Sequence, residues 1–149
     1  MLLKLGYDVY GCDVSTYAVN KANKLHNWKR CFVMDIQNTR DIRKISVKYH
    51  LITMFNTIEH IHNIESTLLN IKYLLDKEGI LLVQTVNPLN PFILLDNDPT
   101  HINVHSPLYW KKVFSKYFSI VIIRNYRYFH GKLLIPCPLL GYITIIIAK

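Results

Sequence analysis

Cysteine is scarce in this sequence, and the positions of the few cysteines exclude two kinds of site. Among 149 residues there are three, Cys12, Cys31 and Cys137, and no two of them form a Cys-x-x-Cys pair. An odd number of scattered cysteines indicates neither a disulfide framework nor a zinc site. We therefore expect a reducing, cytoplasmic setting.

Long apolar runs are missing as well. No run reaches the roughly 18 residues that a membrane-spanning helix needs, and residues 1–4 turn polar too soon for a signal peptide. Half of the residues are apolar and 19% are charged, which is typical of a folded domain. At this length we expect a single domain over residues 1–149 and no membrane partner.

The sequence has no dense block of basic residues, although it is basic overall. The net charge is +8 and the isoelectric point is about 9.4, which brings nucleic acid into consideration as a partner. The basic residues gather only loosely, over 21–30 and 111–116, as they do on solvated helix faces. Nucleic acid is an alternative that we do not favour.

Alternating strand-like and helix-like segments predict an α/β fold. The expected strands cover residues 7–12, 31–34, 50–55, 80–86, 119–127 and 142–148. Strands that alternate with helices predict a doubly wound, mostly parallel sheet. The continuous apolar run at 50–55 predicts a strand buried on both faces. No helix separates the last two strands, so we expect them to pair as an antiparallel hairpin.

Three helices are expected, each with one apolar face. Those faces consist of Ala18, Ala22 and Leu25; of Leu68, Ile71 and Leu75; and of Trp110, Val113, Phe114 and Tyr117. Ser15 is predicted to cap the first helix and Ser106 the third. Gly79 is predicted to end the second helix in the left-handed conformation.

A long polar segment, 87–103, and an apolar segment, 133–140, are expected to be loops. Just after the prolines of the first, polar and apolar residues alternate, so an extended chain would place His101, Asn103 and His105 on one face. That face could contact a substrate or, together with His60, a metal ion. We do not expect a metal, because no cysteine and no firmly placed carboxylate completes a ligand shell.

Asp13 stands at the carboxyl end of the first predicted strand, where open α/β sheets bind ligands and an acidic residue takes a pair of ribose hydroxyls. The Gly-rich turn that holds the rest of such a cofactor normally lies ~20 residues earlier. Too few residues precede Asp13 to contain that turn. We therefore expect half of a cofactor site and a sheet that lacks its first strand. The alternative role of Asp13 is to stabilise a helix start.

Four segments, in order and at family-like spacing, resemble the class I S-adenosylmethionine-dependent methyltransferases, in particular the type 11 branch. They are GCDVS (11–15), MDI (34–36), FNTIEHI (55–61) and LLDKEGILLV (74–83). The resemblance covers nearly the whole chain and implies a Rossmann-like sheet, S-adenosylmethionine as cofactor and methyl transfer as the reaction. Enzymes that methylate nucleobase amino groups usually carry Asn/Asp-Pro-Pro-aromatic where this chain reads Asn56-Thr57-Ile58-Glu59. That difference favours a small-molecule acceptor.

The resemblance also implies roles for single residues on the cofactor side. Asp13 would accept the ribose hydroxyls in charge-assisted hydrogen bonds. Asp35 would take the adenine amino group, although an aspartate after a strand is also a common turn residue. The other residues expected to contact the cofactor are Val14, Ile36, Phe55 and Asn56.

On the acceptor side, the resemblance places Glu59 and His60 at the mouth of the active site. His60 can serve as a general base near neutral pH; the alternative is a helix-start glutamate beside an exposed histidine. The residues expected to contact the substrate are His101, Asn103, His105 and Tyr109. Trp110 is expected in the core.

The missing glycine turn leaves three explanations open. The chain is a fragment of a full catalytic domain, which we favour; or a partner chain or second copy supplies the missing half; or it is an inactive remnant or binding module. An NAD-dependent oxidoreductase is a further alternative, because it would use the same acidic strand end. It would not explain the Glu59-His60 pair.

Overall fold

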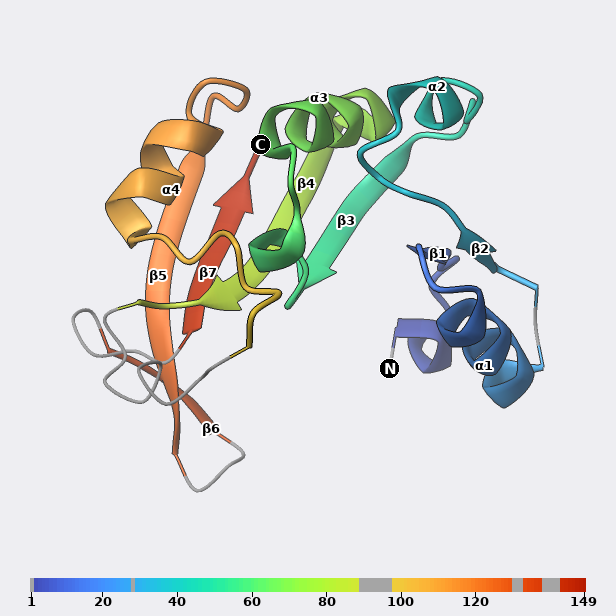
Figure 1. The fold of residues 1–149 in the computed structure, drawn as a ribbon, viewed down its shortest axis with the longest axis horizontal. Coiled ribbons are helices and arrows are strands. Elements are labelled where there is room, and N and C mark those ends of the chain that lie inside the picture. Colours follow the sequence, from blue (N-terminus) through green and yellow to red (C-terminus); the bar gives the residue numbers. More distant parts are fainter. Residues whose placement is uncertain (1, 28, 89–97, 130–132, 138–142) are drawn as a thin grey trace.

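The computed structural model describes residues 2–27, 29–88, 98–129, 133–137 and 143–149. Its strands form two sheets: a parallel pair, β1-β2, and a five-stranded sheet in the order β3-β4-β7-β5-β6 (Figure 1). The strands are β1 (Gly11–Asp13), β2 (Cys31–Val33), β3 (Tyr49–Phe55), β4 (Leu75–Val86), β5 (Val121–Phe129), β6 (Leu133–Pro136) and β7 (Ile143–Ala148). The helices are η1 (Leu2–Leu5), α1 (Thr16–His26), α2 (Thr39–Ile42), η2 (Ile58–His60), α3 (Ile64–Leu74) and α4 (Pro107–Phe114).

The expected α/β architecture is confirmed. Strands β1 and β2 are parallel, as are β3 and β4, while β7 runs antiparallel to both β4 and β5. The predicted terminal hairpin is therefore the β5-β7 pair, with β6 added on the outer side of β5. The predicted loop at 133–140 is wrong over Leu133–Pro136, which forms β6, and its part at 138–140 lies outside the described residues. Residues 89–97 of the other predicted loop also lie outside the described residues.

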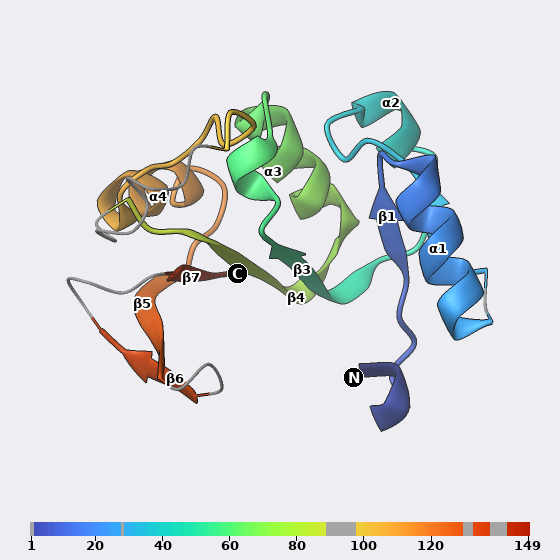
Figure 2. The ribbon, with the colours of Figure 1, turned by 60° about the horizontal axis from the view of Figure 1, so that its bottom comes forward.

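The main core lies between the five-stranded sheet and helices α3 and α4, which cover one of its faces (Figure 2). Leu81 and Val83 of β4 are fully buried there, together with Trp110 and Phe114 of α4. The helix stripe predicted around Trp110 is thus confirmed. Ser106 caps α4 as predicted, because its hydroxyl accepts a hydrogen bond from the backbone N–H of Tyr109.

The other face of the sheet is apolar and open to solvent in the described structure. It includes side chains from four strands: Leu51 and Phe55 (45% and 53% exposed), Ile80 (38%), Ile122 (43%) and Ile147 (37%). The prediction that β3 is buried on both faces is therefore wrong. Strand β3 is an edge strand, and within the described residues no strand pairs with its outer side.

The two sheets are joined by side chains of α3 and not by strand pairing. The buried Asn70 amide donates to the carbonyl of Ile36, just after β2, at 2.8 Å. The Ser66 hydroxyl donates to the carbonyl of Gln37 at 2.9 Å. The rings of Tyr10, just before β1, and Tyr49, at the start of β3, also make contact, with their centroids 6.3 Å apart. These bonds hold β1 and β2 near the five-stranded sheet while leaving the strand edges unpaired.

Several details of the helices and strands differ from the sequence prediction. The first strand is Gly11–Asp13, shorter and later than the predicted 7–12. Helix α1 starts after Ser15 as predicted, but it buries Val19 and leaves Leu25 71% exposed. Helix α3 ends at Leu74, and β4 begins at Leu75. The sequence prediction placed Leu75 on the apolar face of that helix.

Gly79 does not end a helix, which corrects its predicted role. It lies within β4 and does not have a positive φ. A Cβ atom at this position would lie 2.7 Å from the backbone oxygen of Tyr49, at the irregularity where the β3-β4 register shifts. Gly79 is therefore required for close approach of two strands and not for a left-handed turn. Among the described helices, none is both long and apolar enough to cross a membrane.

Candidate active site

The two predicted adenosine-binding carboxylates lie at the carboxyl ends of paired strands. Asp13 is the last residue of β1 and pairs with Val33 of β2, and its carbonyl accepts a hydrogen bond from the backbone N–H of Met34 at 3.0 Å. Asp35 follows directly. Both side chains are exposed to solvent. The parallel pairing thus brings the two aspartates to the same edge of the small sheet.

Each aspartate also makes a turn-type hydrogen bond to the chain that follows it. One Asp13 oxygen accepts from the backbone N–H of Ser15 at 2.8 Å, and one Asp35 oxygen accepts from that of Gln37 at 2.8 Å. Such bonds fix the orientation of a short carboxylate side chain. A carboxylate has acceptor sites on both oxygens, so the turn role and a ligand role are compatible at both positions.

Cys12 lies between these groups. A cavity of about 220 Å³ between α1 and β1 is lined by Gly11, Cys12, Asp13, Ala18, Val19, Ala22 and Cys31. Desolvation raises the pKa of the Cys12 thiol, and the charges of Asp13 and Asp35 raise it further. The Cys12 thiol is kept protonated and is a poor nucleophile.

The remaining cofactor-side residues occupy the ends of β1, β2 and β3. Val14 is 68% exposed and Phe55 is 53% exposed, so both present apolar surface to the outside. Ile36 instead packs partly against the core. Asn56 has a φ of 48°, in the left-handed region that asparagine tolerates, and its backbone N–H donates to the carbonyl of Gln84 at 3.0 Å. This turn redirects the chain from β3 into η2.

Glu59 is fully buried, which the sequence did not predict. One carboxylate oxygen, Oε2, accepts a hydrogen bond from the Thr85 hydroxyl at 3.0 Å. The other, Oε1, has no hydrogen-bond partner among the described residues. Glu59 does lie in the first turn of η2, as the alternative interpretation has it, but its side chain is buried, and His60 is only partly exposed. The Glu59 carbonyl accepts from the backbone N–H groups of Ile102 and Asn103, at 2.9 and 3.0 Å, which fixes this part of the chain against η2.

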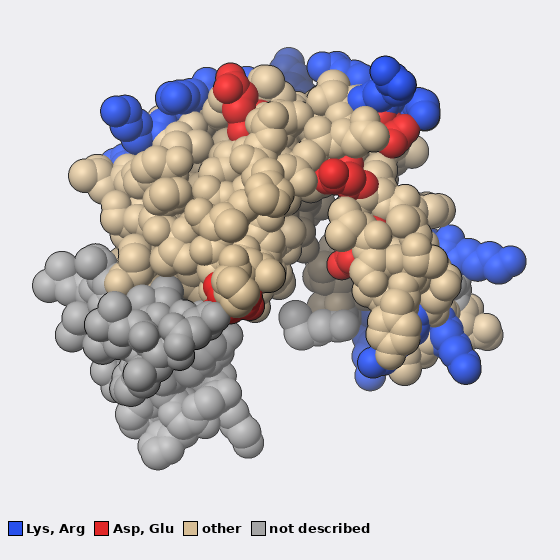
Figure 3. All heavy atoms as spheres, in the orientation of Figure 1, with Lys and Arg blue, Asp and Glu red and all other residues tan. Residues whose placement is uncertain are grey.

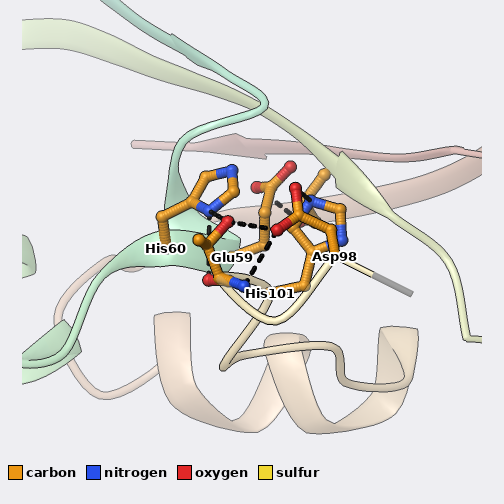
Figure 4. Close-up of polar contacts among 6 residues, drawn as sticks. Glu59, His60, Asp98 and His101 are labelled. Atoms are coloured by element: carbon orange, nitrogen blue, oxygen red, sulfur yellow. Dashed lines mark hydrogen bonds and ion pairs between the residues drawn. The ribbon is translucent and has the colours of Figure 1, made fainter. Parts of the chain in front are cut away.

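His60 lies beside Glu59, and its neighbours determine its tautomer (Figure 4). Its Nδ1 is 3.1 Å from the carbonyl oxygen of Thr100 and 3.0 Å from the Thr100 hydroxyl. That hydroxyl already donates to Asp98 Oδ1 at 2.6 Å, and a carbonyl can only accept. Nδ1 must therefore carry the proton, which leaves the lone pair of Nε2 available.

His101 is the one predicted substrate residue whose side chain joins this pair. Its ring centroid is 4.8 Å from that of His60, and its side chain is 16% exposed. Its Nε2 lies 3.8 Å from Asp98 Oδ2. Hydrogen bonds from the Thr100 hydroxyl and backbone N–H lower the pKa of Asp98, and the two histidines lower it further.

The other predicted substrate residues make different contacts. The Asn103 amide donates to the carbonyl of Ile61, so it holds the loop in place. The His105 ring lies 3.9 Å from that of Tyr109 and 5.6 Å from that of Trp110, and burial lowers the pKa of His105. The three alternating polar residues thus contact different partners.

Sequence reasoning missed Thr85, Asp98 and Thr100, which position Glu59 and His60. Thr85 was assigned only to a strand. Asp98 and Thr100 form a short turn in which the Asp98 carboxylate accepts from the Thr100 backbone N–H at 2.9 Å. An aspartate two residues before a threonine in a Pro-containing segment is typical of such a turn, and that signal could have identified them.

The space-filling view is hollowed between the part of the chain that holds β1, β2 and α1 and the larger part that holds the five-stranded sheet (Figure 3). Lys and Arg side chains lie mainly along the outer margins in this view, and the hollow itself shows few of them. The strand ends that carry the candidate residues belong to these two parts. The hollow is a concave surface between these two parts.

Comparison with protein families gives one match. The model of a family described as a methyltransferase domain matches residues 1–117. The sequence has no significant match among curated proteins.

Solved structures share the fold at low sequence identity. A SAM-dependent methyltransferase from Archaeoglobus fulgidus has a TM-score of 0.74 at 18% identity, covering 99% of this chain and 80% of that one. The CMeT domain of the citrinin polyketide synthase has a TM-score of 0.71 at 21% identity, with coverage of 99% and 40%. Magnesium protoporphyrin IX methyltransferase from Synechocystis, solved with bound SAH, has a TM-score of 0.64 at 15% identity, with coverage of 99% and 66%.

Proposed function

The chain belongs to the family of methyltransferase domains, and from this premise we propose that it transfers the methyl group of S-adenosylmethionine to a small-molecule acceptor. The observation that carries the proposal is the pair of aspartates at the ends of two paired parallel strands, Asp13 and Asp35. Both carboxylates are exposed and oriented by turn bonds. Carboxylates at such strand ends suit ribose hydroxyls and an adenine amino group.

The residues around the aspartates fit the rest of a nucleoside. Val14 offers exposed apolar surface for one face of a flat base, and Ile36 offers a backbone N–H beside it. Phe55 and Asn56, at the end of β3, would border the methionine part of the cofactor. When bound, S-adenosylmethionine supplies a methyl group that its sulfonium already activates, so the protein chiefly has to orient the reactants.

His60 has the arrangement of a general base. The Thr100 carbonyl and hydroxyl hold its Nδ1–H, so Nε2 can accept a proton from the acceptor. The buried Glu59 carboxylate, bonded to Thr85, stabilises positive charge that develops on the neighbouring imidazole. Glu59 acts through His60 and is a positioning residue in this proposal.

The positions of the Lys and Arg side chains favour a small acceptor over nucleic acid. Lys and Arg lie mainly on outer margins in Figure 3, away from the hollow where a base would have to enter. A cytoplasmic location belongs to the same proposal, because Cys12, Cys31 and Cys137 are all free thiols.

Calorimetry on the expressed chain tests the cofactor assignment. We expect S-adenosylmethionine to bind and Asp13→Asn to weaken binding at least about tenfold, since hydrogen bonds to a charged group contribute ~1.5–3 kcal/mol and 1.4 kcal/mol is about tenfold. Asp76→Asn, an exposed carboxylate at the start of β4, is the matched control and should leave affinity unchanged. Binding of NAD instead of S-adenosylmethionine, or equal affinity in both variants, would contradict the proposal.

The open strand edges support a second part of the proposal: residues 1–149 form one methyltransferase domain that a further strand completes. The outer side of β3 is unpaired, and β1 pairs only with β2 within the described residues. The face next to β3 carries exposed apolar side chains, among them Leu51 and Phe55, and such exposed apolar surface often marks an interface. A strand added beside β3 would satisfy backbone groups that are now open to solvent.

The expressed chain is accordingly expected to self-associate. Light scattering should give a mass above that of one chain at micromolar concentration, and an apolar dye should bind. Leu51→Lys places a charge on the open face and should lower both signals without loss of helix content by circular dichroism. A monodisperse monomer that binds no dye would show that the edge and the face are not left open in solution.

A further inference from the structure

Glu59, His60 and His101 bring three metal-ligand groups together. One ligand atom from each lies within 4.8 Å of the other two. Figure 4 shows Glu59, His60 and His101 gathered in one place, with the two imidazole rings coming from η2 and from the segment that follows Asp98. Two imidazoles and one carboxylate form a donor set that suits zinc and other divalent first-row ions.

The surroundings of the buried Glu59 carboxylate would suit a bound cation. Glu59 is 0% exposed, and Oε1 has no hydrogen-bond partner among the described residues. The bond that Oε2 accepts comes from the neutral Thr85 hydroxyl. Burying a carboxylate is costly unless it is paired with a charge or coordinates a metal. An ion beside Oε1 would supply that charge.

The surroundings of His60 match those of a metal-bound histidine. Its Nδ1–H is directed to the Thr100 carbonyl and hydroxyl, at 3.1 and 3.0 Å. Ligating histidines nearly always donate their second N–H to a carbonyl or carboxylate, which fixes the ring and its tautomer. The lone pair of Nε2 is then available to an ion. Asp98, beside both Thr100 and His101, provides a second carboxylate in the outer shell.

The spacing requires a small adjustment on binding. At metal–ligand bonds of about 2.0–2.2 Å, two ligand atoms lie at most about 4 Å apart, so the side chains must close by roughly 1 Å. Neither histidine is fully buried. His60 lies on a three-residue helix, η2, and His101 lies in a segment without regular secondary structure.

We propose that Glu59, His60 and His101 form a binding site for one divalent first-row transition metal ion, with a coordination position left open. Three protein ligands are the number that catalytic zinc sites use, and their fourth position holds water or substrate. The site does not depend on the proposed methyl transfer, because ion binding can be measured without cofactor or acceptor. If both hold, the ion and the acceptor proton compete for His60 Nε2.

Titration of the expressed chain with Co²⁺ and Zn²⁺ tests the site. We expect one Co²⁺ per chain, visible absorption bands of a four- or five-coordinate ion, and displacement by Zn²⁺. His101→Ala removes one ligand and should weaken binding at least about tenfold, since even outer-shell changes cost 10–100-fold. Glu59→Gln keeps the shape and an acceptor for Thr85 but removes the charge, and it should have a similar effect.

His62→Ala is the matched control, because His62 is exposed and lies on the same segment as His60. It should leave the affinity unchanged, and circular dichroism of all three variants checks that they fold. Binding that His101→Ala and Glu59→Gln leave intact, or a thiolate-to-cobalt charge-transfer band that marks a site at Cys12 and Cys31, would overturn the proposal. So would the absence of ion binding by the folded wild-type chain. None of these outcomes bears on S-adenosylmethionine binding, so the two proposals fail separately.

Discussion

His60→Ala is expected to lower the rate of methyl transfer about 10²–10⁴-fold, the range for removal of a positioned general base. The reason is the hydrogen bonding around the ring: Thr100 holds Nδ1–H, and Nε2 is left to accept the acceptor proton. The rate is measured as S-adenosylhomocysteine formed with a panel of phenol, thiol and amine acceptors. Added imidazole should restore part of the lost activity, which a purely structural role of His60 would not predict.

Two further variants sharpen this experiment. His62→Ala, at an exposed position on the same segment, should retain the wild-type rate. Thr100→Val removes the hydroxyl that contacts His60 and should lower the rate less than His60→Ala does, because the Thr100 carbonyl contact stays. A His60→Ala variant that keeps a rate within about twofold of wild type would show that transfer requires no base at this position.

Phe114→Ala is expected to reduce the free energy of unfolding by about 3–5 kcal/mol, the usual cost of deleting a buried aromatic side chain. Phe114 is 0% exposed and packs between Trp110 and Phe118, with ring centroids 6.0 and 6.2 Å away. It joins α4 to the β-sheet core. Urea denaturation followed by circular dichroism measures the change.

The same helix provides the control. Leu108→Ala also truncates a large apolar side chain in α4, but Leu108 is 77% exposed, so the change should stay within about 0.5 kcal/mol. Phe114→Leu is the milder variant for the case in which Phe114→Ala does not fold, with an expected loss below about 1.5 kcal/mol. If Phe114→Ala and Leu108→Ala have equal effects, α4 does not pack on the sheet as described.

Local sequence signals predicted most helices and strands, but they placed the boundary between α3 and β4 wrongly. Ser15 and Ser106 cap their helices as predicted, because an N-cap depends on a side chain and a backbone N–H only three residues apart. Gly79 was assigned to a helix end because the residues before it follow a helical period. The chain instead enters β4 at Leu75, and the reason for glycine is the backbone of Tyr49, thirty positions earlier. No local pattern contains that contact.

The candidate site divides in the same way. That two aspartates would lie at neighbouring strand ends followed from the strand order alone, since carboxyl ends of parallel strands meet at one edge. The sequence argument against a metal relied on the lack of a placed carboxylate. In the structure, Glu59 is buried beside His60 and His101, and the loop that carries His101 is fixed by backbone bonds to Glu59 itself.

The sequence by itself determined the alternation of strands and helices, the helix starts and the family, because each depends on residues close together in the chain. Only the tertiary structure decided which charges are buried and which sheet edges stay open. The tautomer of His60 and the burial of Glu59 both arise from contacts between η2, β4 and the segment that follows Asp98. Burial and hydrogen bonding across such long sequence separations depend on packing, which a linear pattern does not encode.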